Sequence, residues 1–191
     1  MTAEDAEPLR FADATEAEAW YEAHHADTDK AWFVIAKKGS ALQTPTLTEL
    51  LDLALAFGWI DGQRRSLHDQ AYLQSYGPRR ARSPWSQINR DKVAALTAAG
   101  RMRPAGIAEV ERAKQDGRWD AATASPSTAE VPADFLEALE ASPAAKEFYA
   151  TLNKSNTFAI YYQLHHAKRP ETRARRIEKF IAMFERGEKL Q

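Results

Sequence analysis

A segment with few core-forming residues divides this chain and so limits what it can fold into. Residues 121–132, AATASPSTAEVP, are mostly small or polar and include two prolines. This composition is typical of a linker, because it offers little to bury and proline interrupts helices and strands. We therefore expect two structural units, residues 1–120 and residues 133–191, rather than one continuous core.

The first unit has the patterns of a small sheet packed with helices. Residues 31–39, AWFVIAKKG, are rich in β-branched and aromatic residues, which predicts a strand. Residues 46–58, TLTELLDLALAFG, repeat leucine at helical spacing and end at a glycine, which predicts a helix. Residues 59–66, WIDGQRRS, and residues 71–79, AYLQSYGPR, are predicted to form two further strands. The expected fold class is α+β, with a mainly antiparallel sheet.

Alternation along the last two strands assigns their side chains to opposite faces of the sheet. Ile60 and Leu73 fall on one face, which can pack on the leucine-rich helix. The other face is aromatic yet polar and needs either a cover or a ligand. Its members are Trp59, Asp61, Tyr72, Gln74 and Tyr76.

Helical patterns fill the chain after the linker and predict an all-α C-terminal unit. The segments PADFLEALEA, SPAAKEFYATL and SNTFAIYYQLHHAK each have helical character, with Ser155 as the expected N-cap of the third. The final segment repeats apolar residues at helical spacing, at Ile177, Phe180, Ile181 and Phe184. Near the N-terminus, Thr15 is the expected N-cap of a further helix.

Positive charge is concentrated between the leucine-rich helix and residue 90. Residues 57–90 hold six arginines, no lysine and two acidic residues, whereas the whole chain has a net charge of −1. Guanidinium groups bind phosphate or carboxylate oxygens in bidentate fashion, and a helix N-terminus attracts anions. The motif PRRARSPWS combines both features, because its Ser86 is the expected cap of a helix. A small anion, or an acidic group of a partner protein, is the ligand that this composition favours.

The candidate ligand-binding residues come from the motifs GWIDG and PRRARSPWS and from their neighbours. They are Trp59, Asp61, Arg64, Tyr72, Arg79, Arg80, Arg82, Ser83, Trp85, Ser86 and Asn89. A structural interpretation stays open beside the functional one. In it Ser86 only caps its helix, while the arginines pair with the acidic N-terminal region or stack on Trp85, and Trp59 belongs to the core.

Long segments of the chain resemble the YdeI/OmdA family, also called the bacteriocin-protection or OmpD-associated family. They are residues 57–93, which hold both motifs, residues 100–122, GRMRPAGIAEVERAKQDGRWDAA, and residues 142–189, which are similar to the family's helical C-terminal domain. The resemblance runs from about Phe11 to Leu190. It implies a bacterial protein with a small α+β domain followed by a helical domain, and a link to bacteriocin resistance or envelope stress. It assigns no reaction and no catalytic residue.

Several classes of site are not expected. The chain has no cysteine, and its histidine pairs, at 24–25 and 165–166, are adjacent residues whose rings diverge on a helix, so no metal site is predicted. No phosphate-binding loop or dinucleotide fingerprint occurs, and no cofactor is expected. The N-terminus lacks the pattern of a signal peptide and no segment has the length of an apolar membrane span, so we expect a soluble cytoplasmic protein without membrane insertion.

The residues favour a non-enzymatic binding protein with an arginine–aromatic anion site, and the resemblance implies a stress-protection role for it. One alternative is a small-molecule enzyme in which Asp61 or His68 is the acid or base and the arginines clamp the substrate. A less favoured alternative is a nucleic-acid-binding protein, because residues 168–179 are also basic. In that segment glutamates dilute the charge.

Overall fold

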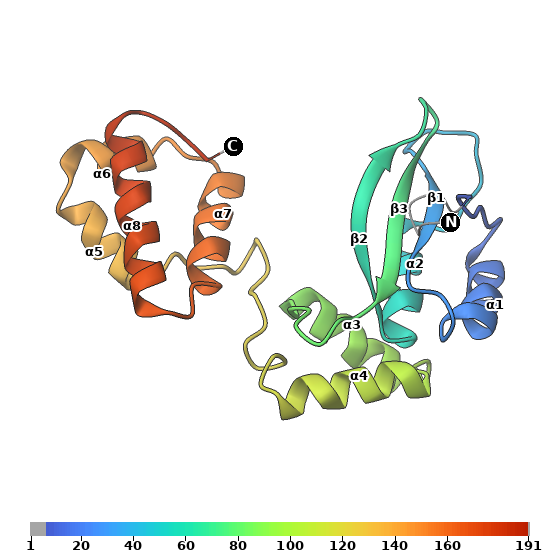
Figure 1. The fold of residues 1–191 in the computed structure, drawn as a ribbon. Coiled ribbons are helices and arrows are strands. Elements are labelled where there is room, and N and C mark those ends of the chain that lie inside the picture. The colour runs from blue at the N-terminus through green and yellow to red at the C-terminus, as the bar shows by residue number, and fades with distance from the viewer. Residues whose placement is uncertain (1–6, 191) are drawn as a thin grey trace. The chain divides into compact units, whose positions relative to one another are not determined.

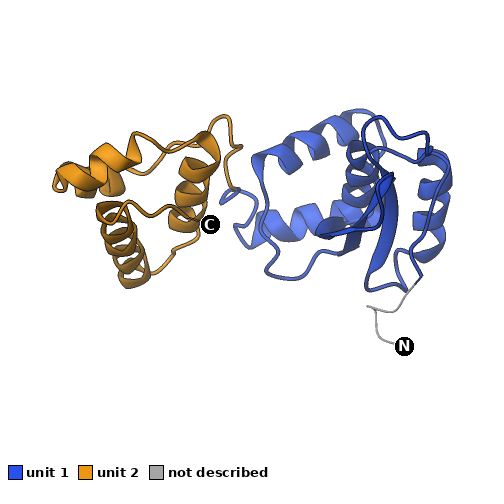
Figure 2. Ribbon diagram, turned by 90° about the horizontal axis from the view of Figure 1, so that it is seen from above, with its two compact units in different colours: residues 1–122 blue, residues 123–191 orange. Residues whose placement is uncertain are grey.

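The computed structural model describes residues 7–190. The chain divides between Ala122 and Thr123 into two compact units (Figure 2). The strands that the structure describes all lie in the first unit, and the described part of the second unit contains only helices. The predicted α+β class, with an all-α C-terminal part, is confirmed.

A three-stranded antiparallel sheet forms the centre of the first unit (Figure 1). Its strands are β1 (Ala31–Ala36), β2 (Trp59–Ser66) and β3 (Ala71–Pro78), and β3 lies between the other two. Both outer strands run antiparallel to β3, so the C-terminal ends of β1 and β2 lie at the same end of the sheet, beside the start of β3. We refer to this as the upper end and to the opposite one as the foot, following Figure 1.

The sheet face that packs on the leucine-rich helix is the aromatic one, so the expected assignment of the two faces was wrong. Trp59 and Tyr76 are each 1% exposed and share a core cluster with Leu50 and Leu53 of that helix. Ile60 is partly buried against a second core cluster that includes Leu55 of the same helix, and Leu73 is also only partly buried. The physical reason is that large rings bury more apolar area than branched aliphatic side chains, and Trp59 and Tyr76 each carry only one polar atom.

Two helices supply this cover, α1 (Ala14–His24) and α2 (Leu47–Ala56). The N-cap of α1 is Asp13, whose carboxylate accepts a hydrogen bond from the backbone N–H of Glu16 at 2.9 Å; Thr15, the expected cap, lies inside the helix. At α2 the side chain of Thr46 accepts from the backbone of Glu49, and the Glu49 carboxylate accepts from the backbone N–H of Thr46. This capping box begins α2 where the sequence predicts it.

Helices α3 (Gln87–Ala98) and α4 (Pro104–Gln115) complete the first unit at the foot of the sheet (Figure 1). The backbone of α4 lies directly against the end of α2. A Cβ atom on Gly106 would lie 2.1 Å from the carbonyl oxygen of Ala56, and the backbone N–H of Arg103 donates to that same oxygen at 3.0 Å. This close approach, which requires glycine, brings one face of α4 beside the end of β3.

The second unit consists of four helices around an aromatic core. They are α5 (Ala133–Glu140), α6 (Pro143–Tyr149), α7 (Lys154–His165) and α8 (Pro170–Glu185). Phe135, Phe180 and Phe184 are buried at its centre. Asn153 caps α7 by accepting from the backbone N–H of Asn156, so the prediction of Ser155 as the cap was wrong; an asparagine two residues earlier offers the same hydrogen bond.

Two features are absent from the described residues. Over residues 7–190, no helix combines the length and the apolar character needed to cross a membrane. Over the same range, no three histidine, aspartate or glutamate side chains gather as a metal-binding group would require.

Candidate functional site

Arg79, which follows β3 at the foot of the sheet, carries a buried positive charge. Its side chain is 6% exposed, and its guanidinium carbon lies 3.7 Å from the ring centre of Trp85. Nη1 donates to the carbonyl oxygen of Pro84 at 3.0 Å. Nε and Nη2 are buried and have no hydrogen-bond partner among the described residues. Burial lowers the pKa of Arg79 to about 10, an effect that the nearby Glu109 carboxylate partly opposes.

The main chain holds Arg79 in this position from both sides. Its N–H donates to the carbonyl oxygen of Gly58 at 3.1 Å, which continues the pairing of β3 with β2. Its carbonyl oxygen accepts from Nη2 of Arg112 on α4 at 3.3 Å. The backbone of Gly58 packs closely against the backbone of α4, since a Cβ atom on Gly58 would lie 2.9 Å from the carbonyl oxygen of Ala105. The approach of α4 to α2 therefore also positions Arg79.

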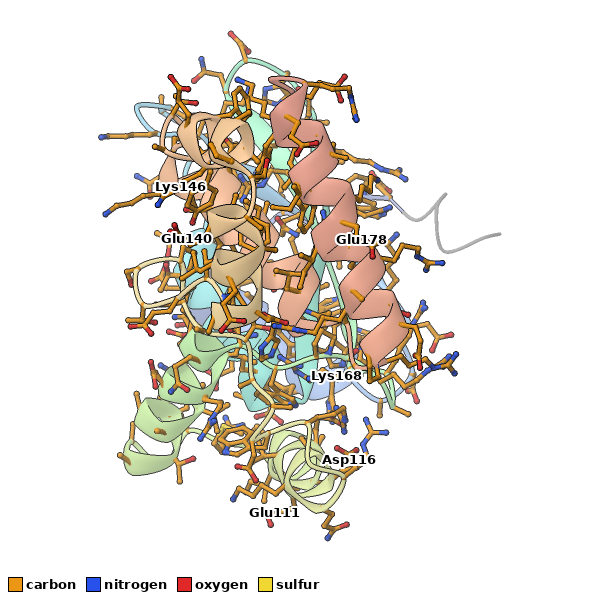
Figure 3. All side chains as sticks on the ribbon, turned by 90° about the vertical axis from the view of Figure 1, so that its left-hand side faces the viewer. Glu111, Asp116, Glu140, Lys146, Lys168 and Glu178 are labelled. Carbon is orange, nitrogen blue, oxygen red and sulfur yellow. The ribbon has the colours of Figure 1, made fainter. Side chains whose placement is uncertain are left out.

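A buried carboxylate on α4 organises the neighbouring arginines. Glu109 is 8% exposed and forms an ion pair with Arg112 on one oxygen, while its other oxygen lies 3.2 Å from Nη1 of Arg118. Arg118 also pairs with Asp116 at 2.8 Å, near the C-terminal end of α4 (Figure 3). That hydrogen bond from Arg118 lowers the pKa of Asp116. We call these five residues, Arg79, Arg112, Arg118, Glu109 and Asp116, the arginine cluster.

The arginine cluster has one positive charge in excess, because three guanidinium groups face two carboxylates. Glu109 and Asp116 are bound by Arg112 and Arg118. Among residues 7–190, no carboxylate lies at ion-pair distance from Arg79. The unpaired charge of the cluster therefore belongs to its most buried cation.

A pocket of about 350 Å³, which we call the Arg79 pocket, lies beside this charge. Arg79, Glu109 and Arg112 form its polar wall, and apolar and aromatic residues form much of the remainder. The lining residues are His25, Ala26, Phe57, Gly58, Trp59, Pro78, Arg79, Ala105, Ala108, Glu109 and Arg112. Its size suits a small ligand, and the mixture of apolar walls with a few convergent polar groups is typical of small-molecule sites.

His25 adds a hydrogen-bonding group on the side of α1. Its Nδ1 lies 2.8 Å from the carbonyl oxygen of Tyr21, and because a carbonyl oxygen only accepts, Nδ1 carries the proton. In the neutral ring Nε2 is therefore an acceptor, and in the protonated ring it is a second donor. His25 can thus offer a ligand a second ring nitrogen for hydrogen bonding.

The eleven residues predicted from the sequence do not form one site. Trp59 and Arg79 line the Arg79 pocket. Trp59 is buried, as the structural interpretation expects, and its Nε1 donates to the carbonyl oxygen of His25 at 3.1 Å. A second pocket of about 390 Å³ contains Asp61, Arg80 and Ser83. Arg64 and Tyr72 line a third, at the upper end of the sheet.

The remaining four residues have structural positions or exposed side chains. Ser86 caps α3 by accepting from the backbone N–H of Asn89 at 3.2 Å, as the structural interpretation expects. Trp85 is 2% exposed in the core cluster under α3 and α4, and Arg82 is exposed on the loop. Of the alternative catalytic residues, Asp61 pairs in register with Tyr76 and His68 lies in the β2–β3 turn; neither lines the Arg79 pocket.

Five polar residues of the site lie outside the basic segment that the sequence singled out. They are His25 on α1, Glu109 and Arg112 on α4, and Asp116 and Arg118 after it. The i, i+3 spacing of Glu109 and Arg112 is visible in the sequence, but it is common on solvated helix faces. No local pattern indicates that Glu109 is buried, because its burial depends on the contact between α4 and the loop after β3.

Comparison with known proteins gives two matches that together span most of the chain. Residues 9–109 are similar to a domain of unknown function (DUF8412). Residues 128–187 are similar to the OmdA family, described as bacteriocin-protection, YdeI or OmpD-associated. No curated protein and no solved structure matches the chain.

Proposed function

We propose that this chain, which belongs to the DUF8412 family of unknown function and carries an OmdA domain over residues 128–187, binds a small anion in the Arg79 pocket. The ligand is an anionic small molecule or an acidic group of a partner protein. The function is binding rather than catalysis. The bacteriocin-protection label of the OmdA family fits a protective or stress-response role for such binding.

The observation that supports this proposal is the unpaired buried charge of Arg79. Removing a cation from water costs free energy unless an anion or several hydrogen bonds compensate for the loss. The Trp85 ring and the Pro84 carbonyl oxygen compensate in part, but two of the guanidinium nitrogens have no partner among the described residues. An anion in the adjacent pocket would interact electrostatically with this charge and with Arg112, which also lines the pocket.

A purely structural role explains only some of these contacts. In that interpretation Arg79 connects the loop after β3 to Trp85 and stabilises the turn. A neutral side chain could fill the same space without the cost of burying a charge.

Thermal unfolding with added anions tests the proposal. Acetate, phosphate and sulfate, each compared with chloride at equal ionic strength, should raise the melting temperature of the parent protein, because a ligand that binds only the folded state stabilises it. Arg79→Gln removes the charge from the pocket and should remove most of this increase. Arg82→Gln is the matched control, since Arg82 is an exposed arginine of the same loop that does not line the pocket. An equal response in the parent and both variants would overturn the proposal.

A further inference from the structure

A second concave surface, independent of the Arg79 pocket, gathers cations at the upper end of the sheet. It has a volume of about 490 Å³ and we call it the hairpin pocket. It is lined by Ala36, Lys37, Lys38, Arg64, Arg65, Ser66 and Tyr72, four of which are cationic and none of which is acidic.

The topology of the sheet explains how two distant segments meet there. Lys37 and Lys38 follow the C-terminal end of β1, and Arg64 and Arg65 lie near the C-terminal end of β2. These two strands flank β3, so the start of β3, with Tyr72, lies between the two pairs of cations. Because neighbouring strands are about 4.8 Å apart, the two pairs lie on the order of 10 Å from each other.

Within the described residues, three of the four cations have no acidic partner. No carboxylate of residues 7–190 lies at ion-pair distance from Lys37, Lys38 or Arg64. Lys37 instead donates to the carbonyl oxygen of His68 at 2.7 Å, and the guanidinium of Arg64 lies 4.4 Å from the ring centre of Tyr72. These contacts hold two of the side chains in place without neutralising them.

The lack of acidic partners is not a consequence of a basic composition. Residues 1–122 contain 18 acidic and 16 basic side chains. Other cations of the first unit do pair with acids, for example Lys92 with Asp52 and Arg103 with Glu18. Four cations that line one concave surface with no acidic residue among them create a local positive potential, which favours an anionic ligand.

We propose that the hairpin pocket binds a linear oligophosphate group. Guanidinium and ammonium groups donate hydrogen bonds to phosphate oxygens. Ser66 adds a hydroxyl group to the lining of the pocket. A single phosphate presents one anionic group to the two pairs of cations, whereas a chain of phosphates presents several along the width of β3. The phosphate chain is either a free oligophosphate or the backbone of a single-stranded nucleic acid, and both present the same repeated anionic groups.

Binding of inorganic tripolyphosphate, measured by calorimetry on the full chain, tests the proposal. Tripolyphosphate should bind at least roughly tenfold more tightly than orthophosphate, because it reaches both pairs of cations. Raising the salt concentration from about 50 to about 200 mM should weaken this binding, because added ions screen the attraction between exposed charges. The double variant Lys38→Gln/Arg64→Gln should lose at least roughly tenfold in affinity, and Lys38→Arg/Arg64→Lys should retain most of it.

The matched control is Arg80→Gln/Arg82→Gln, which removes two exposed arginines near the foot of the sheet and should bind tripolyphosphate like the parent. A single-stranded oligonucleotide of mixed sequence distinguishes the two sources of phosphate. If it binds and the Lys38→Gln/Arg64→Gln variant loses that binding, the ligand is a nucleic-acid backbone; if only tripolyphosphate binds, it is a free oligophosphate. The proposal is overturned if neither ligand binds, or if the double variant binds as the parent does.

Discussion

Replacing Arg79 by methionine should leave the free energy of unfolding of the first unit within about 1 kcal/mol of the parent value, because a loss and a gain of similar size offset each other. The loss comprises the hydrogen bond to Pro84, worth about 1.5 kcal/mol for a charged donor, and the interaction with the Trp85 ring, worth about 2 kcal/mol when desolvated. The gain is relief from burying the charge. The lowering of the Arg79 pKa to about 10 corresponds to about 3 kcal/mol at neutral pH.

Arg79→Lys is the informative comparison, because it keeps a buried charge and removes the planar group that stacks on Trp85. An ammonium group is more strongly hydrated than a guanidinium group, so its burial is less favourable. We expect the lysine variant to be less stable than the methionine variant by about 2 kcal/mol or more. Neither variant should show the anion-dependent increase in melting temperature to the extent that the parent does.

Urea unfolding at pH 7, followed by tryptophan fluorescence, measures these differences. All five tryptophans lie within residues 1–122, so the signal reports on the first unit alone. A methionine variant destabilised by more than about 4 kcal/mol, together with a lysine variant close to the parent, would refute the reasoning. That result would show that the buried charge of Arg79 stabilises the fold, and the case for an uncompensated cation would fail.

Three further predictions concern the core and the second unit. Trp59→Ala should cost about 3 kcal/mol or more in urea unfolding, because a fully buried ring is lost; a variant as stable as the parent would contradict the burial of Trp59. Gly106→Ala should cost about 3 kcal/mol in the same assay, since its methyl group would overlap the backbone of α2, and a neutral result would show that α4 shifts freely. In the second unit, hydrogen bonding from Arg173 lowers the pKa of Asp134. The pair therefore stabilises the fold fully at pH values above the pKa of this carboxyl group in the unfolded chain. The stabilisation is lost as the pH falls through the pKa of Asp134 in the folded protein. Arg173→Gln should therefore reduce the melting temperature of the second unit at pH 7 and reduce it less near pH 3. An equal reduction at the two pH values would exclude the ion pair as the cause.

A division near residues 121–132 also has a direct test in limited proteolysis. We expect the first internal cleavage in that segment, because it lacks large buried side chains and contains two prolines. The β2–β3 turn, with the exposed Leu67, is the competing site. Earlier cleavage in that turn would show that the predicted linker is the better protected of the two.

Much of the secondary structure follows from local patterns. The capping residues Thr46 and Ser86 begin α2 and α3 as predicted, because a cap is a hydrogen bond between residues only three positions apart. Where the prediction missed, at α1 and α7, an aspartate or asparagine two residues earlier competes for the same role. Which of two neighbouring residues caps a helix depends on small differences in free energy that a sequence pattern does not give.

The sequence predicts only some residues of the candidate site. The concentration of arginine between residues 57 and 90 is evident, but it mixes residues that the structure places in three different pockets. A register of alternating residues says which side chains share a face and not which face becomes buried. That choice was decided by the packing of α1 and α2 on the aromatic face.

The sequence by itself determined the class of fold, the extent of most helices and strands, and the presence of an excess of positive charge, since these depend on residues close together in the chain. Only the tertiary structure decided that Arg79 is buried while Arg80 and Arg82 are exposed, and that Glu109 of α4 binds the arginines beside it. The physical reason is that burial and charge pairing depend on contacts between distant segments. Here those contacts follow from the close approach of α4 to α2 at Gly106.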